Sequence, residues 1–119
     1  MKGLPKISIV LPTYNRGYII TRAIQSILNQ TFKDFELIIV DDCSTDDTES
    51  IVNKLQDRRI RYIKHSKNKG AAASRNTGIK VGQGEFIAFQ DSDDVWLPQN
   101  LEKEIHGKYD FSNITGCLL

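Results

Sequence analysis

The stretch KISIVLPTYN, residues 6–15, decides the fold class of this chain. Its first part, Lys6–Leu11, is an apolar run with several β-branched residues, and a proline closes it. Two further runs have the same character, FELIIV at Phe35–Val40 and FIAF at Phe86–Phe89. Near-continuous apolar runs of this kind are typical of parallel strands that are covered on both faces. We therefore predict three central strands, whereas the alternating run IRYIK at Ile60–Lys64 predicts a strand nearer an edge.

Helical patterns separate these runs. Apolar residues recur at helical spacing within Arg16–Asn29, and Ala71–Val81 forms a second helical stretch that ends near glycines. We expect a helix to begin after Ser44, its predicted N-cap, and another to open at Pro98. Alternating strands and helices indicate a Rossmann-like α/β fold, a mostly parallel sheet in the order 3-2-1-4 with right-handed crossovers. In such sheets ligands bind beyond the carboxyl ends of the strands, so the residues that follow each strand are the candidates for chemistry.

Length and composition exclude several classes of protein. At 119 residues the chain is long enough for one domain with a core but not for two, so we expect residues 1–119 to form a single domain. The formal net charge of +1 predicts no general attraction to nucleic acid. Cys43 and Cys117 form neither a disulfide framework nor a metal-ligand spacing, and the apolar residues before Pro12 are too few for a signal peptide or a membrane span. These features predict a cytoplasmic location and leave peripheral association with the inner face of the membrane open.

The first two strands end in polar segments that suit a nucleobase. After the first strand, Tyr14 is placed to pack against a planar base while backbone groups hydrogen-bond to its edge. The alternative is an ordinary turn in which Thr13 or Asn15 caps the next helix. After the second strand, Asp42 precedes the expected cap, so we expect its carboxylate oxygens to be free for the N–H of a ligand. A dinucleotide-dependent oxidoreductase would need G-x-G-x-x-G where this chain has P-T-Y-N.

Three carboxylates within four residues, Asp91, Asp93 and Asp94, follow the last predicted strand. Like charges this close disfavour one another's ionisation unless water or a cation screens them. Asp91 and Asp93 share a face while the chain stays extended, and two carboxylates on one side of a loop suit a hard divalent cation, Mn²⁺ or Mg²⁺. The alternative is an acidic surface turn. A calcium EF-hand is excluded, because Trp96 stands where that loop needs a glycine.

The segment HSKNKGAAASRNTG, residues 65–78, precedes and forms the start of the predicted third helix. Its small residues allow the helix N-terminus to come close to an anion, and Arg75 is the best candidate to pair with a phosphate or with the acidic cluster. The alternative is a helix packed tightly on the sheet with solvated lysines. His65 has no visible partner and is expected to face solvent, whereas Trp96 is expected to pack beneath the acidic loop.

Five segments together resemble the N-terminal part of inverting family 2 glycosyltransferases with the GT-A fold. They are ISIVLPTYNR, LNQTF, FELIIVDDCSTDDT, NKGAAASRNTG and GEFIAFQDSDDVWLP, and they occur in family order with family-like separations. The resemblance implies a nucleotide-diphospho-sugar donor, often a UDP-sugar, that is bound through a divalent metal. It also implies a glycan or lipid-linked acceptor and a role in polysaccharide biosynthesis.

The resemblance further assigns roles to single residues. The implied nucleotide-binding residues are Pro12, Thr13, Tyr14, Asp42, Arg75, Asp91 and Ser92. The tyrosine segment lies against the base, Asp42 meets the N–H of the base, and Arg75 supports the nucleotide end of the site. Asp91 and Ser92 lie by the ribose or the diphosphate, and Asp93 is the expected metal ligand with Asp91 beside it. The metal would offset the repulsion between the carboxylates and stabilise charge on the leaving UDP.

Family members continue beyond the region of Pro98 into elements that bind the acceptor and carry a general-base Asp or Glu. In this chain no acidic residue of the tail stands in a context that marks it as the base, so the base is unassigned. We expect the donor-binding half of a metal-dependent glycosyltransferase, truncated at its C-terminus. The alternative is a nucleotide-sugar-binding fragment without transfer activity. We also expect self-association, because absent later strands would leave a sheet edge and an apolar face uncovered.

Overall fold

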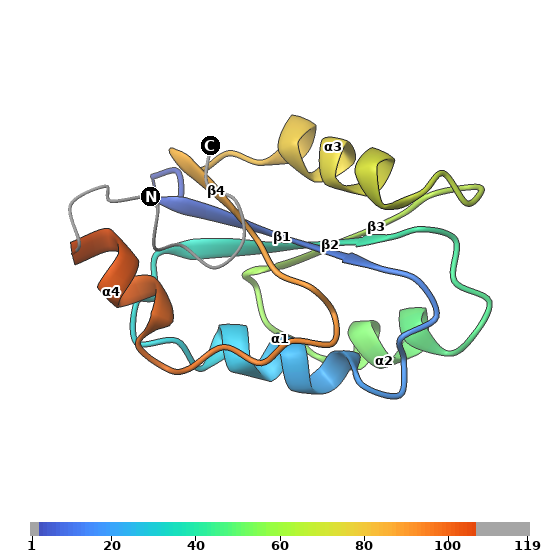
Figure 1. The fold of residues 1–119 in the computed structure, drawn as a ribbon, viewed down its shortest axis with the longest axis horizontal. Coiled ribbons are helices and arrows are strands. Elements are labelled where there is room, and N and C mark those ends of the chain that lie inside the picture. Colours follow the sequence, from blue (N-terminus) through green and yellow to red (C-terminus); the bar gives the residue numbers. More distant parts are fainter. Residues whose placement is uncertain (1–2, 107–119) are drawn as a thin grey trace.

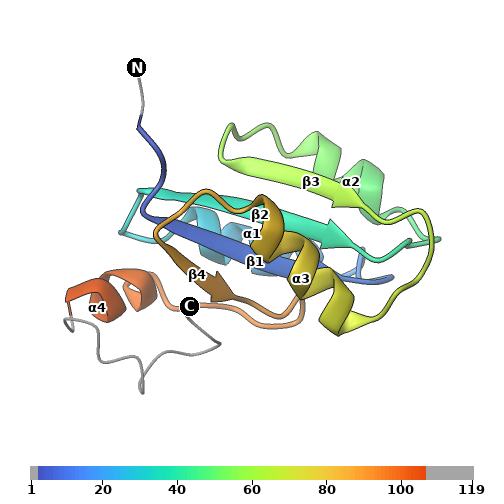
Figure 2. The same ribbon diagram turned by 90° about the horizontal axis from the view of Figure 1, so that it is seen from above.

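The structure is a computed structural model that describes residues 3–106. It contains a four-stranded parallel sheet in the order β3-β2-β1-β4. The strands are β1 (Ile7–Thr13), β2 (Phe35–Asp41), β3 (Ile60–Lys64) and β4 (Phe86–Phe89). The helices are α1 (Ile20–Leu28), α2 (Thr48–Lys54), α3 (Ala71–Val81) and α4 (Asn100–His106). The predicted α/β class and the order 3-2-1-4 are therefore confirmed, and Figure 2 shows the strands side by side in this order.

Helices cover both faces of the sheet. Figure 1 shows α1 and α2 on one face and α3 on the other. On the α1 and α2 face, Ile7, Ile9 and Leu11 of β1 belong to the larger core cluster, whereas Val10 belongs to a smaller cluster on the α3 face. These four side chains are at most 1% exposed. Burial on both faces explains why the strand reads as a near-continuous apolar run that only Ser8 interrupts before Pro12.

The first strand runs two residues further than the sequence suggested, through Pro12 to Thr13. The last backbone bond between β1 and the β4 segment joins the N–H of Gln90 to the C=O of Val10. The nitrogen of Pro12 faces the β4 side of β1, as the backbone groups of Val10 do, but it lies beyond the end of β4. The missing N–H of proline therefore costs no hydrogen bond between the strands. The strand stays paired on its other side, where the C=O of Thr13 accepts from the N–H of Asp42 at 2.9 Å.

Three helices begin later than predicted. The structure starts α1 at Ile20 rather than Arg16, and α4 at Asn100 rather than Pro98. The expectation that Ser44 caps the second helix is wrong, because α2 starts at Thr48. The Ser44 hydroxyl instead accepts a hydrogen bond from the N–H of Asn15 at 2.8 Å. The polar residues between strand and helix therefore join two loops to each other instead of extending the helices.

The remaining expectations on organisation stay predictions. Among residues 3–106, no helix is both long enough and apolar enough to span a membrane. Cys43 is a free, partly buried thiol, and Cys117 lies outside the described residues. The sheet presents β3 and β4 as its edges, and self-association through them is untested.

Candidate functional site

The carboxyl ends of β1, β2 and β4 and the start of α3 surround a pocket of about 300 Å³. Its lining residues are Pro12, Thr13, Tyr14, Asn15, Arg16, Asp42, Ala71, Ser74 and Ser92. Five of the seven predicted nucleotide-binding residues are among them. The other two, Arg75 and Asp91, are exposed and outside this lining. The sheet edge therefore gathers most of the predicted residues around one hollow.

Hydrogen bonds between the first two strand-end loops fix the base of this pocket. Asn15 has a φ of 52°, a left-handed conformation that asparagine tolerates better than most residues. Its side-chain oxygen accepts the N–H of Thr45 at 2.8 Å and that of Asp46 at 3.2 Å. The turn holds Tyr14 at the pocket wall with 44% of its surface exposed, so one part of the ring is available to a ligand.

Asp42 is almost fully buried, and its carboxylate is already engaged. One oxygen, Oδ1, accepts from the Lys69 N–H at 2.8 Å and from His65 Nδ1 at 2.9 Å, and the other, Oδ2, accepts from the Gly70 N–H at 2.8 Å. The expectation that both oxygens are free is therefore wrong. The reason is that the segment after β3 folds back over the end of β2, where it donates to Asp42. Gly70 has a φ of 96°, so a glycine is required for this approach.

His65 is also placed differently from the prediction. It is 7% exposed rather than solvent-facing, because it follows β3 directly and its N–H continues the ladder to the C=O of Asp41. Its two ring nitrogens lie 2.9 Å from Asp42 Oδ1 and 2.8 Å from Thr77 Oγ1. Burial raises the pKa of the Asp42 carboxyl, but the bonds from His65, Lys69 and Gly70 outweigh it and leave that pKa below its ordinary value. Asp42 is thus an ionised, firmly held acceptor at the pocket wall.

The preceding aspartate has a structural position that sequence reasoning missed. Asp41 is fully buried and accepts hydrogen bonds from the Tyr62 hydroxyl and from the Ser44 N–H. Burial and the neighbouring Asp41 carboxylate raise the pKa of Tyr62. Asp41 is not among the pocket residues, so it supports the strand end rather than a ligand.

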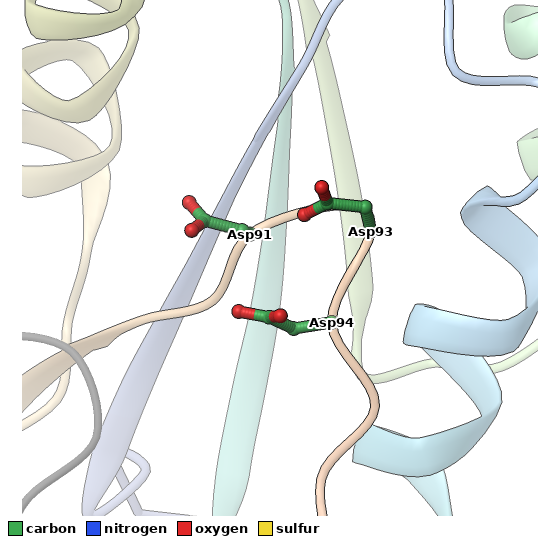
Figure 3. Close-up of side chains that lie close together, drawn as sticks. All are labelled: Asp91, Asp93 and Asp94. Carbon is green, nitrogen blue, oxygen red and sulfur yellow. The ribbon is translucent and has the colours of Figure 1, made fainter.

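The predicted acidic cluster forms, although by a different geometry. Figure 3 shows Asp91, Asp93 and Asp94 on one loop beyond β4, and a carboxylate oxygen from each lies within 4.8 Å of the others. The chain is not extended here, because the Asp94 N–H donates to the Asp91 C=O in a turn. This turn brings in Asp94, which the argument from alternating side chains had left out. Trp96 packs into the core beneath the loop, as predicted.

The donor set of this cluster fits a divalent cation. All three carboxylates are exposed, and none forms an ion pair with another residue within the described part of the chain. Carboxylate oxygens are the ligands that Mg²⁺ and Mn²⁺ prefer, and a bound cation would relieve the repulsion among them. The residue between the first two, Ser92, is buried and lines the pocket. The acidic cluster therefore adjoins the pocket along one short loop.

One further group in the pocket wall has no partner. Thr13 is 4% exposed, and its hydroxyl oxygen forms no hydrogen bond within the described residues. Buried polar groups in folded proteins are nearly always hydrogen-bonded, so an unpaired hydroxyl in a pocket wall is suited to a polar ligand. The structure thus combines an aromatic ring, an unpaired hydroxyl and a held carboxylate beside a cluster of three carboxylates.

Comparison with known proteins agrees with this arrangement. The model of the family described as glycosyl transferase family 2 matches residues 8–107. The chain belongs to this family. A relative in Escherichia coli, the UDP-Glc:alpha-D-GlcNAc-diphosphoundecaprenol beta-1,3-glucosyltransferase WfaP, is 46% identical over 100 residues. That match covers 84% of this chain and 40% of WfaP.

Solved structures show the same fold with bound donors. Residues 1–349 of S. aureus TarS in complex with UDP-GlcNAc align with a TM-score of 0.83 and 34% identity, covering 90% of this chain and 32% of that one. The mannosyltransferase PcManGT from Pyrobaculum calidifontis, in complex with GDP-Man and Mn²⁺, aligns with a TM-score of 0.82 and 25% identity. That match covers 91% of this chain and 33% of PcManGT. The resemblance to the N-terminal part of a GT-A glycosyltransferase is therefore confirmed, and this family 2 chain spans less than half the length of each of these three proteins.

Proposed function

We propose that this chain binds a nucleotide-diphospho-sugar, with UDP as the nucleotide, through a divalent cation. The observation that carries the proposal is the position of Ser92 in the pocket wall between Asp91 and Asp93. A nucleoside held in the pocket would extend its diphosphate towards the carboxylate cluster, where only a cation can reconcile the two negative groups. The UDP-GlcNAc bound by TarS and the Mn²⁺ bound by PcManGT support this choice of ligands.

Each predicted residue has a role in this proposal. Tyr14 packs against the face of the base, and the unpaired Thr13 hydroxyl and Asp42 hydrogen-bond to polar groups of the nucleoside. Pro12 shapes the wall behind them, and Ser92 lies by the ribose or the diphosphate. Arg75 follows Ser74 of the lining and has no ion-pair partner among the side chains of residues 3–103, so its guanidinium is available to the nucleotide.

The metal site would be formed by Asp93 and Asp91. A divalent cation there, Mn²⁺ or Mg²⁺, supplies charge stabilisation to a leaving nucleoside diphosphate. The protein residues hold the carboxylates within reach of one ion, through the turn that the Asp94 N–H closes onto Asp91. The donor is then positioned by the chain from its base to its diphosphate.

The whole protein would transfer the sugar to a glycan or lipid-linked acceptor, with inversion. The named acceptor of WfaP, a diphosphoundecaprenol-linked sugar, supports a lipid-linked acceptor and therefore a place at the cytoplasmic face of the membrane. We assign no catalytic base among residues 3–106. The chain spans 40% of WfaP, and this favours a second candidate function for the chain alone, donor binding without transfer.

Calorimetric titration of UDP into the purified chain, with and without Mn²⁺, tests the proposal. Mn²⁺ should raise the affinity for UDP at least tenfold, and Asp93→Ala should abolish that gain because the ion loses a ligand. Asp34→Ala is the matched control, since it removes one exposed carboxylate just before β2, at the opposite, amino end of the strands. Tyr14→Ala should weaken binding equally with and without the ion. Equal UDP affinity with and without Mn²⁺ would refute the metal-site proposal. A transfer assay with a UDP-sugar separates the two candidate functions, glycosyl transfer and donor binding without transfer.

A further inference from the structure

The environment of Asp42 defines how many hydrogen bonds it can offer a nucleobase. A carboxylate accepts about four hydrogen bonds, two at each oxygen. At Asp42 the Oδ1 atom already accepts from Lys69 and His65, and Oδ2 accepts from Gly70. One acceptor position therefore remains, and it belongs to Oδ2. Asp42 lines the pocket and has one unfilled acceptor position instead of two free oxygens.

His65 is the side chain that completes this arrangement. Because the Asp42 carboxylate is ionised and has no hydrogen to donate, His65 must carry a hydrogen on Nδ1. The Nε2 atom faces Thr77 Oγ1 at 2.8 Å, and that hydroxyl also donates to the Ala73 C=O at 3.0 Å. Because this hydroxyl has one hydrogen, its bond to Ala73 leaves it able only to accept from a protonated Nε2, and donation to an unprotonated Nε2 would replace the bond to Ala73. In both cases the bond between Nε2 and Thr77 fixes the orientation of the ring, and Nδ1–H continues to donate to Asp42.

Nucleobases differ in the number of donors that meet such a carboxylate. The Watson–Crick edge of uracil carries one donor, the N3–H group, between two carbonyl oxygens. The corresponding edge of guanine carries two adjacent donors, N1–H and the N2 amino group, which a free carboxylate accepts with one oxygen each. If Oδ1 is full, one guanine donor remains without a partner. Proteins of this fold bind sugar nucleotides with either base, since TarS is seen with UDP-GlcNAc and PcManGT with GDP-Man.

We infer that His65 is a specificity-determining residue, which occupies Asp42 Oδ1 and so selects a base with one imide N–H over guanine. This inference rests on the proposed function, because it requires a nucleotide in the pocket. His65 acts through Asp42 and touches no ligand, so it is a positioning residue. Leaving a buried donor unpaired costs roughly ten- to a hundredfold in affinity, which is the size of the discrimination that His65 supplies.

The test is the ratio of UDP affinity to GDP affinity, measured by calorimetry on the purified chain at one fixed Mn²⁺ concentration. His65→Ala removes the donor and frees Oδ1, so the ratio should fall at least tenfold from its wild-type value. His65→Asn is the matched control, because its side-chain N–H₂ overlays the position of Nδ1 and should restore most of the ratio. Thr77→Val removes the group that holds the ring and should lower the ratio by a smaller factor, without touching Asp42.

The possible results are distinguishable. A wild-type chain that binds neither nucleotide refutes the proposed function and this inference with it. A wild-type chain that binds UDP, with the same UDP-to-GDP ratio in His65→Ala, refutes the inference alone. Should His65→Ala fail to fold, as judged by circular dichroism, the Thr77→Val ratio decides: an unchanged ratio in that folded variant overturns the inference. Tyr14→Ala should lower the affinity for both UDP and GDP and leave their ratio unchanged, which separates stacking on the base from discrimination between the two bases.

Discussion

Replacing Gly78 by alanine should destabilise the protein, although alanine favours helices. Gly78 lies in α3 against the central strand β1, and a Cβ atom at this position would lie 2.4 Å and 2.7 Å from the two methyl carbons of Val10. Carbon atoms normally approach to about 3.5–4.0 Å, so the helix or Val10 must move by roughly 1 Å. Val10 is fully buried beside Ile38 and Val40, so it has no room to move.

The magnitude follows from two opposed terms. Overpacking of this kind costs about 1–3 kcal/mol, and the short contacts place Gly78→Ala at the upper end. The gain in helix propensity from glycine to alanine is about 1 kcal/mol. The unfolding free energy should therefore fall by about 2 kcal/mol, which corresponds to a decrease in Tm of roughly 10 °C. Displacement of α3 should also weaken UDP binding, because Ala71 and Ser74 of this helix line the pocket.

Urea unfolding followed by circular dichroism measures this change. Asn76→Ala is the control, because Asn76 is exposed on the same helix and its replacement should stabilise the chain by about 0.5 kcal/mol. Combining Gly78→Ala with Val10→Ala should cost less than the sum of the two single changes, since the added methyl group occupies the space that Val10 leaves. If Gly78→Ala proved as stable as the wild type, α3 would not be packed on β1 as tightly as described.

Two further changes test one buried and one partly exposed polar contact. Tyr62→Phe should lower the unfolding free energy by about 1–3 kcal/mol, because the buried Asp41 carboxylate loses a hydrogen-bond donor, and equal urea midpoints would contradict this. Hydrogen bonds from Arg59 hold the pKa of Asp57 at about 2, below its ordinary 3.8, so this pair contributes stability above pH 3.8 that is lost as the pH falls through about 2. Asp57→Asn should therefore cost about 1–2 kcal/mol at pH 7 and progressively less below pH 4, and a difference from wild type that did not change with pH would refute the assignment.

The sequence by itself determined the sheet and the place of the site. The apolar runs of β1, β2 and β4 and the alternation of β3 predicted the strands, because burial on two faces or one leaves a local pattern in the chain. Parallel strands bring their carboxyl ends to one edge, so the pocket residues could be predicted from their position after the strands. Tyr14 and Asp42 were found in this way and Ser92 through the family resemblance, and all three line one pocket in the structure.

Only the tertiary structure decided which polar groups pair with each other. The partners of Asp42 are His65, Lys69 and Gly70, and they follow it by 23 to 28 positions in the sequence. No local pattern marks such a bond, because the pairing depends on how the loop after β3 folds back over β2. The turn that gathers Asp94 with Asp91 is likewise set by a backbone bond that the alternation of side chains could not predict. Hydrophobic periodicity is fixed by the local geometry of a strand or helix, whereas a buried hydrogen bond is fixed by the approach of segments that are distant in the sequence. The chemistry of Asp42 depends on such buried hydrogen bonds.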